Sequence, residues 1–229
     1  MTDSALRELA DDPSSRKRFF KMLGGAGAVS AATVLLAACG GDDDDAASDS
    51  PPPATAVDNN KSDLEILNFA LTLEFLEADF YKQVIASGLV KDKMVADLAK
   101  KFGATEEEHA EALSATIKEM GGKPVDAPET KFQPTLDKGL MATLETAATV
   151  ENLGAAAYLG QAGSIKNKEV LAAALAIHTV EARHAAALNR LVGRGFMGDG
   201  DLSGSIPNGA FAKPMDMAAV NEAVKPFLA

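Results

Sequence analysis

The sequence predicts an all-α protein whose core is a bundle of four long helices with one long crossover. Ala and Leu are abundant, Trp is absent, and aromatic residues make up only 5% of the 229 residues, which favours helix over sheet. Four amphipathic stretches follow one another after residue 61. The connections between them are short, long and short, the pattern of a four-helix bundle whose crossover joins helices 2 and 3.

Residues 1–38 have the features of an export signal. A basic segment at residues 15–21 precedes a weakly apolar run that is short for a membrane span and ends in small residues before Cys39. Leu36-Ala-Ala-Cys39 resembles the bacterial lipobox, which implies that Cys39 is lipidated and becomes the mature N-terminus. A membrane anchor that is never cleaved is the alternative.

The basic segment Ser15-Arg-Lys-Arg-Phe-Phe-Lys21 also resembles a twin-arginine (Tat) export signal, with Lys17 in place of the second Arg and Phe20 in place of Leu. That resemblance implies export of a folded protein, often one folded around a metal, and general secretion is the alternative. Cys39 is the only cysteine, so the chain has no disulfide and no thiolate metal site. We therefore expect an exported protein of the periplasm or cell envelope, held to the membrane by a lipid on Cys39.

The charge of the chain fits a lipid anchor rather than a basic contact surface. The net charge of −11 argues against a nucleic-acid partner, because phosphates would be repelled. It also leaves the acyl chain to hold the membrane. Residues 39–61 include four consecutive aspartates and Pro-Pro-Pro, which predicts a disordered acidic tether between the lipid and the folded domain.

The helical bundle is expected over residues 62–193. Its first helix, residues 62–87, begins at Ser62-Asp-Leu-Glu65, which has the spacing of a capping box. Its second helix, residues 92–120, is closed by two glycines. A break inside the second helix is an alternative, because Gly103 interrupts it and Thr105 could act as an internal cap.

The second half of the bundle follows a long connection. Residues 121–135 contain Pro and lack periodicity, and when extended they reach roughly 45–50 Å, enough to run the length of a bundle. The third helix is expected over residues 136–160 and the fourth over residues 167–192, with Leu171, Leu175, Leu188 and Leu191 facing inward. Residues 194–229 are expected to form an irregular C-terminal tail that packs on the bundle, with room for one short helix.

Two similar octets carry most of the histidine of the chain. Residues 106–113 read EEEHAEAL and residues 181–188 read EARHAAAL, and together they hold two of the three histidines. A Glu and a His three residues apart project side by side from a helix, here within an apolar stripe. Because a carboxylate in a core is costly when it is left unpaired, each of these acids needs a partner. The shared pattern selects Glu106 and leaves Glu107 and Glu108 as surface charges.

The other two helices each supply one inward acid. Glu74 and Glu151 are each followed seven residues later by one of the two tyrosines of the chain, Tyr81 and Tyr158. The matching positions indicate an internal duplication of a helix pair. Glu77 is a rival to Glu74 as the inward acid, although only Glu74 has a counterpart in the other half.

This set resembles the ferritin-like superfamily of di-metal carboxylate proteins, in which two helices give one Glu each and two give Glu-x-x-His. The narrower resemblance is to bacterial ferritin-like-domain proteins related to desiccation-associated plant proteins. It rests on residues 66–81, on Glu181-Ala-Arg-His184 and on the apolar C-terminal tail, and it covers residues 61–229.

The resemblance implies a site for two Fe ions, with Mn as the alternative. It assigns terminal, bridging and imidazole ligands in pairs, namely Glu74 and Glu151, Glu106 and Glu181, and His109 and His184. Tyr81 and Tyr158 would donate hydrogen bonds to ligand carboxylates, with ordinary aromatic packing as the alternative. His178, one turn before Glu181, would support the ligands from outside, with a role as a seventh ligand as the alternative.

The sequence thus predicts a lipid-anchored ferritin-like protein with a di-iron or di-manganese centre that reacts with O₂ or peroxide. Whether it is an enzyme is left open. The alternative is a non-enzymatic bundle of the envelope, associated with stress or desiccation, whose metal is structural or vestigial. Hydrogen-bonded polar residues without any metal are a further alternative for the site. The tether and the tail argue against a closed storage shell, so we expect a monomer or a dimer.

Overall fold

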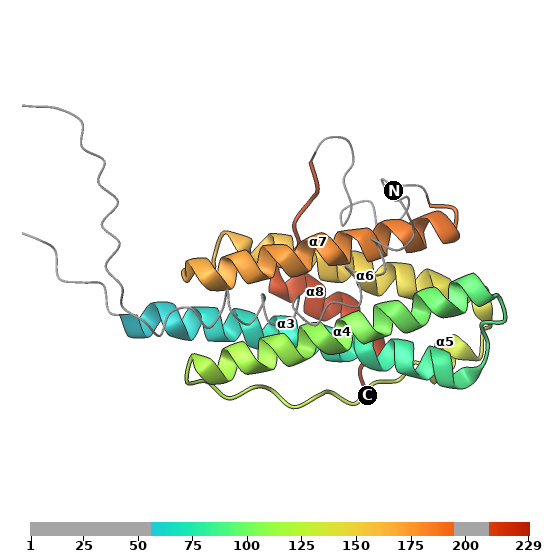
Figure 1. Cartoon of the computed structure of the whole chain (residues 1–229), viewed down its shortest axis with the longest axis horizontal. Helices are drawn as coiled ribbons and strands as arrows, with labels where there is room; N and C mark the ends of the chain where they lie inside the picture. The colour runs from blue at the N-terminus through green and yellow to red at the C-terminus, as the bar shows by residue number, and fades with distance from the viewer. Residues whose placement is uncertain (1–55, 195–210) are drawn as a thin grey trace, which may run out of the picture.

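The computed structural model describes residues 56–194 and 211–229, with side chains from residue 60 onward. The export signal, Cys39 and residues 39–55 of the expected tether lie outside the described residues. The described part is helical, with one isolated β-bridge, which confirms the all-α fold class. Four long helices form the bundle (Figure 1), namely α3 (Ala56–Ser87), α4 (Lys93–Glu119), α6 (Leu140–Ala162) and α7 (Lys168–Leu191).

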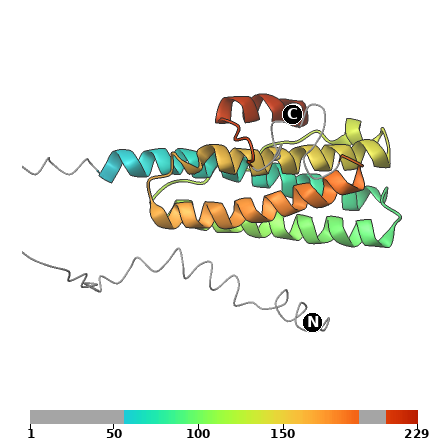
Figure 2. The ribbon, with the colours of Figure 1, turned by 90° about the horizontal axis from the view of Figure 1, so that it is seen from above.

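The four helices are arranged as two antiparallel hairpins. α3 packs against α4, α6 packs against α7, and the hairpins meet through α3 and α6. The segment after α4 runs back along the whole bundle before α6 begins (Figures 1 and 2). The expected long crossover between the second and third bundle helices is therefore present.

Local capping fixes the ends of the second and fourth bundle helices. The Asp92 side chain accepts from the backbone N–H of Val95 at 3.0 Å and starts α4. Gly121 has a φ of 78°, and the Gly122 N–H donates to the Ile117 carbonyl at 2.8 Å, which closes the helix in a Schellman motif. The Asn167 side chain caps α7 in the same manner as Asp92 caps α4.

The expected start of the first bundle helix at Ser62 is wrong, because α3 begins at Ala56. The acid in the apparent capping box, Asp63, has a different role. Asp63 is buried and accepts from the backbone N–H groups of Lys166 and Asn167 at 2.8 and 2.7 Å. Asp63 therefore satisfies the loop between α6 and α7 rather than belonging to the first turn of its own helix.

The alternative of a break in α4 is also wrong. Gly103 lies inside a continuous helix, and a Cβ at this position would be 2.8 Å from the Cβ of Tyr81. The glycine therefore permits close approach of α3. Thr105 donates to the Lys101 carbonyl at 2.9 Å within the helix and caps nothing. Glu106 accordingly stands on regular helix.

The third bundle helix begins four residues later than expected. A short helix, α5 (Gln133–Leu136), ends before Gly139, whose φ of 94° separates it from the start of α6 at Leu140. The expected inward face of the fourth helix is partly wrong as well. Leu175 is 44% exposed, while Ala174 and Ile177 are buried in its place. On such an Ala-rich helix, residue size does not identify the core face.

The C-terminal tail is more regular than expected. Its described part contains α8 (Met217–Val224) and a 3₁₀ turn, η3 (Lys225–Phe227), and α8 lies against the outside of the bundle beside α6 (Figure 2). Val220 and Val224 are buried there. The Met215 N–H donates to the Ala156 carbonyl at 3.0 Å. Leu228 forms the β-bridge with Thr130 of the crossover.

Among the helices of the described residues, none combines the length and the apolarity needed to cross a membrane. The bundle itself therefore presents no candidate span within residues 56–194 and 211–229.

Candidate metal centre

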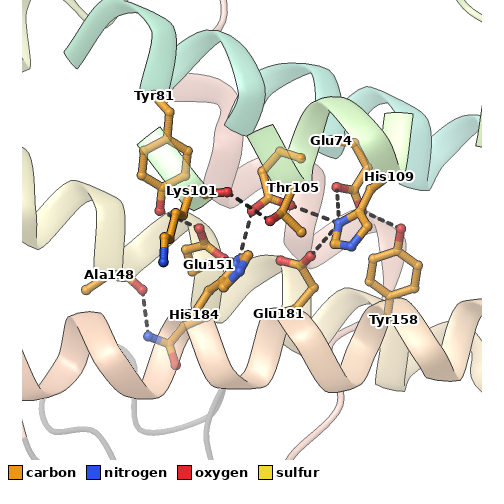
Figure 3. A network of polar contacts seen from close by, with 12 residues as sticks. Glu74, Tyr81, Lys101, Thr105, His109, Ala148, Glu151, Tyr158, Glu181 and His184 are labelled. Atoms are coloured by element: carbon orange, nitrogen blue, oxygen red, sulfur yellow. Dashed lines mark hydrogen bonds and ion pairs between the residues drawn. The ribbon is translucent and has the colours of Figure 1, made fainter. Parts of the chain in front are cut away.

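The six side chains expected as ligands converge at the centre of the bundle, as Figure 3 shows for five of them. Each helix contributes from a buried face, and the four carboxylates have no exposed surface. The side chains of His109 and His184 are 11% and 7% exposed. The contributors are Glu74 from α3, Glu106 and His109 from α4, Glu151 from α6, and Glu181 and His184 from α7.

The imidazole of His109 lies among three carboxylates. Its Nδ1 is 2.9 Å from Glu106 Oε2, 3.2 Å from Glu74 Oε2 and 3.1 Å from Glu181 Oε1. One nitrogen cannot donate its single hydrogen to three acceptors at once. These atoms therefore surround a point where a cation could sit.

The imidazole of His184 has the matching position in the other half. Its Nδ1 is 2.8 Å from Glu106 Oε1 and 3.2 Å from Glu151 Oε2. Despite these short separations, His184 Nδ1, Glu106 Oε1 and Glu151 Oε2 are not joined by hydrogen bonds of regular geometry. These three atoms lie close together, as ligand atoms around an ion do.

The ligand atoms form two overlapping groups. Glu74, Glu106, His109 and Glu181 offer atoms within 4.8 Å of one another, and so do Glu106, Glu151, Glu181 and His184. Glu106 and Glu181 belong to both groups. Two adjacent ions held in these groups would be bridged by those two carboxylates.

The electrostatics of the centre show how poorly the acids are balanced by the side chains alone. Burial raises the pKa of Glu74 and Glu151, and it raises the pKa of Glu181 well above the ordinary value. Burial also acts to raise the pKa of Glu106, but its contacts with His109 and His184 outweigh this and lower that pKa to about 2. Glu106 is thus the carboxylate that the two imidazoles hold ionised.

The pKa values of both imidazoles are raised, against the effect of burial. Burial would lower the pKa of His109, but the charge of Glu74 and the contacts with Glu106 and Glu181 raise it. Burial opposes the charge of His184 too, yet Glu106 and Glu151 raise its pKa to about 9. Without metal, bound protons offset the negative charge of the carboxylates at this centre. Metal binding would displace these protons.

The donor set fits a pair of first-row divalent ions. Four carboxylates carry four negative charges, which two divalent ions would neutralise, and no Lys or Arg of the described residues pairs with them. Carboxylate oxygens with one imidazole per ion suit Fe or Mn. Glu181, whose two oxygens both lack a hydrogen-bond partner, is the clearest sign that a cation is needed.

Two tyrosines link the halves of the bundle reciprocally. Tyr81 of α3 donates a hydrogen bond to Glu151 Oε1 of α6, and Tyr158 of α6 donates to Glu74 Oε1 of α3 at 2.5 Å. Burial raises the pKa of both phenols well above the ordinary value, so both remain donors. Each hydroxyl holds one oxygen of its carboxylate and leaves the other oxygen facing the imidazole.

We expect Tyr158→Phe to lower metal affinity by about 10–100-fold, because Glu74 loses the donor that orients it. Tyr81→Phe should lower affinity similarly through Glu151. Calorimetric titration of each full-length variant with Fe(II) under anaerobic conditions would measure this. If each substitution weakens only one of two binding steps, the tyrosines act on separate ions, and unchanged affinity in both variants would contradict the orienting role.

The remaining sequence-predicted residues fall outside the two groups. His178 belongs to neither group, and its Nδ1 contacts the Ala155 carbonyl on α6 at 3.0 Å, so its support of the ligands stays a prediction. Glu107 and Glu108 are exposed, as expected for surface charges. Glu77, the rival to Glu74, is buried beside the centre without joining either four-residue group.

Sequence reasoning missed Phe102. Its ring stacks on the imidazole of His184 with 3.8 Å between centroids and 23° between planes, and it also meets Tyr81 edge to face. Phe102 therefore covers one side of the centre and limits the approach of water to His184. Its position one turn before Glu106 was visible in the sequence, but it reads there as ordinary core.

A family model described as "Ferritin-like domain" matches residues 62–194, which is more than half of the chain. Among curated proteins, no match to the chain was found.

Proposed function

The chain belongs to the ferritin-like domain family, and we propose that it binds two iron ions, or two manganese ions, at the six-residue centre. The observation that carries the proposal is the pair of overlapping ligand groups that share Glu106 and Glu181. A bundle that merely retained polar residues would satisfy them with hydrogen bonds. Here five buried ligand atoms have no such partner, two of them on Glu181.

We further propose that the centre has redox activity toward O₂ or peroxide. Two bound iron ions would supply electrons in a pair to such a small oxidant. The chain contributes the geometry: His109 and His184 would hold the ions through Nδ1, Tyr81 and Tyr158 orient the terminal carboxylates, and Phe102 shields one side from water. Because the tyrosines stay protonated, they orient the carboxylates by donating hydrogen bonds, and the carboxylates keep their negative charge.

The cellular setting is proposed from the sequence alone. An export signal over residues 1–38 and a lipobox ending at Cys39 would place the bundle in the periplasm or cell envelope on a lipid anchor. A twin-arginine route suits this centre, since its ligands come from all four helices and assemble only when the bundle has folded. The relation to desiccation-associated proteins belongs to the same proposal.

Metal content decides the binding proposal. The full-length protein, loaded anaerobically with Fe(II) or Mn(II) and freed of excess metal, should retain about two ions per chain by elemental analysis. Fewer than one ion per chain would overturn it. Consumption of O₂ or peroxide by the Fe(II)-loaded protein would then test the redox activity.

The deep burial of the centre favours a second candidate function. No ligand side chain is more than 11% exposed, which suits an ion that is held rather than one that meets substrates. In that case the protein would be a non-enzymatic envelope bundle, associated with stress or desiccation, whose metal stabilises the fold. Two bound ions without measurable O₂ or peroxide consumption would support this function over the redox one.

A further inference from the structure

We propose that Glu77 is a seventh ligand of the metal pair and makes its two positions unequal in affinity. The inference rests on the proposed metal binding, and it concerns a carboxylate that neither four-residue group contains. It assigns to Glu77 a role in addition to Glu74, not in place of it.

The first observation is the burial of Glu77. Its side chain is 2% exposed, and its Oε2 has no hydrogen-bond partner. Among the described residues, no Lys, Arg or His pairs with it. Glu77 lies three residues after Glu74, so both project from the same face of α3 toward the centre. A carboxyl group so placed is costly to ionise, so it either keeps a proton or is joined by a cation that the side chains do not provide.

The second observation is the direction of the carboxylate. A Cβ added at Gly154 of α6 would lie 2.9 Å from Glu77 Oε1 and 3.1 Å from Glu181 Oε2. The Glu77 and Glu181 carboxylates therefore meet at the same glycine, across the interface between α3, α6 and α7. Glu181 is a shared member of both ligand groups, so Glu77 lies beside a proposed ligand of the metal pair.

The third observation is the broken symmetry of the duplication. Glu74 corresponds to Glu151, and the residue three positions later is Glu77 in one half and Gly154 in the other. All six proposed ligands have counterparts, whereas Glu77 does not. Gly154, in the half that lacks the acid, leaves the space that the Glu77 carboxylate of the other half occupies. The two differences are therefore complementary.

The contacts of Glu74 exclude an exchange of roles between the two acids. Glu74 accepts from Tyr158 through Oε1 and lies 3.2 Å from His109 through Oε2, so both of its oxygens have partners within the centre. A purely structural Glu77 would be expected to have a donor for Oε2, and it has none. A bound ion would supply the missing partner.

The test is anaerobic calorimetric titration of the full-length protein with Fe(II), before any turnover. The wild-type protein should bind two ions with unequal affinities. In Glu77→Gln, which keeps the shape of the side chain, one affinity should fall at least tenfold and the other should change less than threefold. Glu65→Gln, on an exposed position of the same helix, is the matched control and should leave both affinities unchanged.

Two further measurements protect the test from a folding defect. Metal-free Glu77→Gln should melt at or above the wild-type temperature, because it lacks an unpartnered buried carboxylate. Gly154→Ala keeps Glu77 but fills the space at its carboxylate, and Ala is a good helix former. The added Cβ would also lie 3.1 Å from Glu181 Oε2, so Gly154→Ala should lower both Fe(II) affinities, whereas Glu77→Gln should lower one.

Each outcome decides the matter. Unchanged Fe(II) affinities in both Glu77→Gln and Gly154→Ala would overturn the role of Glu77 while leaving the two-ion centre intact. Equal loss of both affinities in a Glu77→Gln protein that melts normally would also overturn it, because Glu77 would then act on the whole centre. A wild-type protein that binds no Fe(II) or Mn(II) would remove the proposed function, and this inference with it.

Discussion

Glu106→Gln is expected to lower the affinity for both metal ions by more than about 100-fold, exceeding the effect typical of a residue that only supports a ligand. Within the part of the chain that the structure describes, Glu106 is the one carboxylate whose two oxygens approach both imidazoles, at 2.9 Å from His109 and 2.8 Å from His184. An amide in its place offers one oxygen, so it can serve at most one ion. It also removes the negative charge that the two histidines share.

The neighbouring position provides the control for this prediction. Glu107→Gln makes the same chemical change on the next residue of α4, which is exposed and belongs to neither ligand group. Elemental analysis after anaerobic Fe(II) loading should find two ions in the control and almost none in Glu106→Gln. If Glu106→Gln retained two ions with nearly unchanged affinity, the bridging role would be lost and the centre would need another shared ligand.

The bundle and the convergence of its polar residues could be predicted because both leave periodic traces in the sequence. Apolar stripes give the helices, and a Glu-x-x-His pair inside a stripe must face the core. The duplication allows each position to be compared with its counterpart in the other half, so Glu106 could be distinguished from Glu107 and Glu108 from the sequence. The assignment of individual ligands remains a prediction.

The details that escaped prediction depend on contacts between segments distant in the sequence. Asp63 resembled part of a helix cap, yet it binds backbone groups about one hundred residues away, at Lys166 and Asn167. Gly103 resembled a helix breaker, yet it admits Tyr81 from α3. In both cases a residue type with a strong local meaning was used for a tertiary purpose, which overrides local propensity.

Glycine at position 154 shows the same limit within the centre itself. In the sequence it looks like the loss of an acid from one copy of the repeat. In the structure it is the surface against which Glu77 and Glu181 lie. Only the juxtaposition of α3 with α6 shows that the missing side chain in one half accommodates the additional one in the other.

Metal loading is expected to raise the melting temperature of the protein by roughly 10–20 °C. Five buried glutamates and two histidines of the centre have only each other and two tyrosines as partners in the metal-free state. Ions that bind the folded but not the unfolded chain stabilise it by about 2.7 kcal/mol each at one hundred times their Kd, or about 5 kcal/mol for two. For a chain of this size, about 1 kcal/mol corresponds to roughly 2–4 °C.

The physical origin of that shift makes it specific to the centre. Differential scanning calorimetry of the full-length protein with and without Mn(II), which does not oxidise readily in air at neutral pH, would measure it. A chelator should reverse it, and Glu106→Gln should abolish it while Glu107→Gln keeps it. A protein that bound two ions without any change in melting temperature would bind them equally tightly when unfolded. The buried carboxylates of the folded protein would then be neutralised by protons alone. The shift therefore distinguishes a core assembled around metal from a core that merely tolerates it.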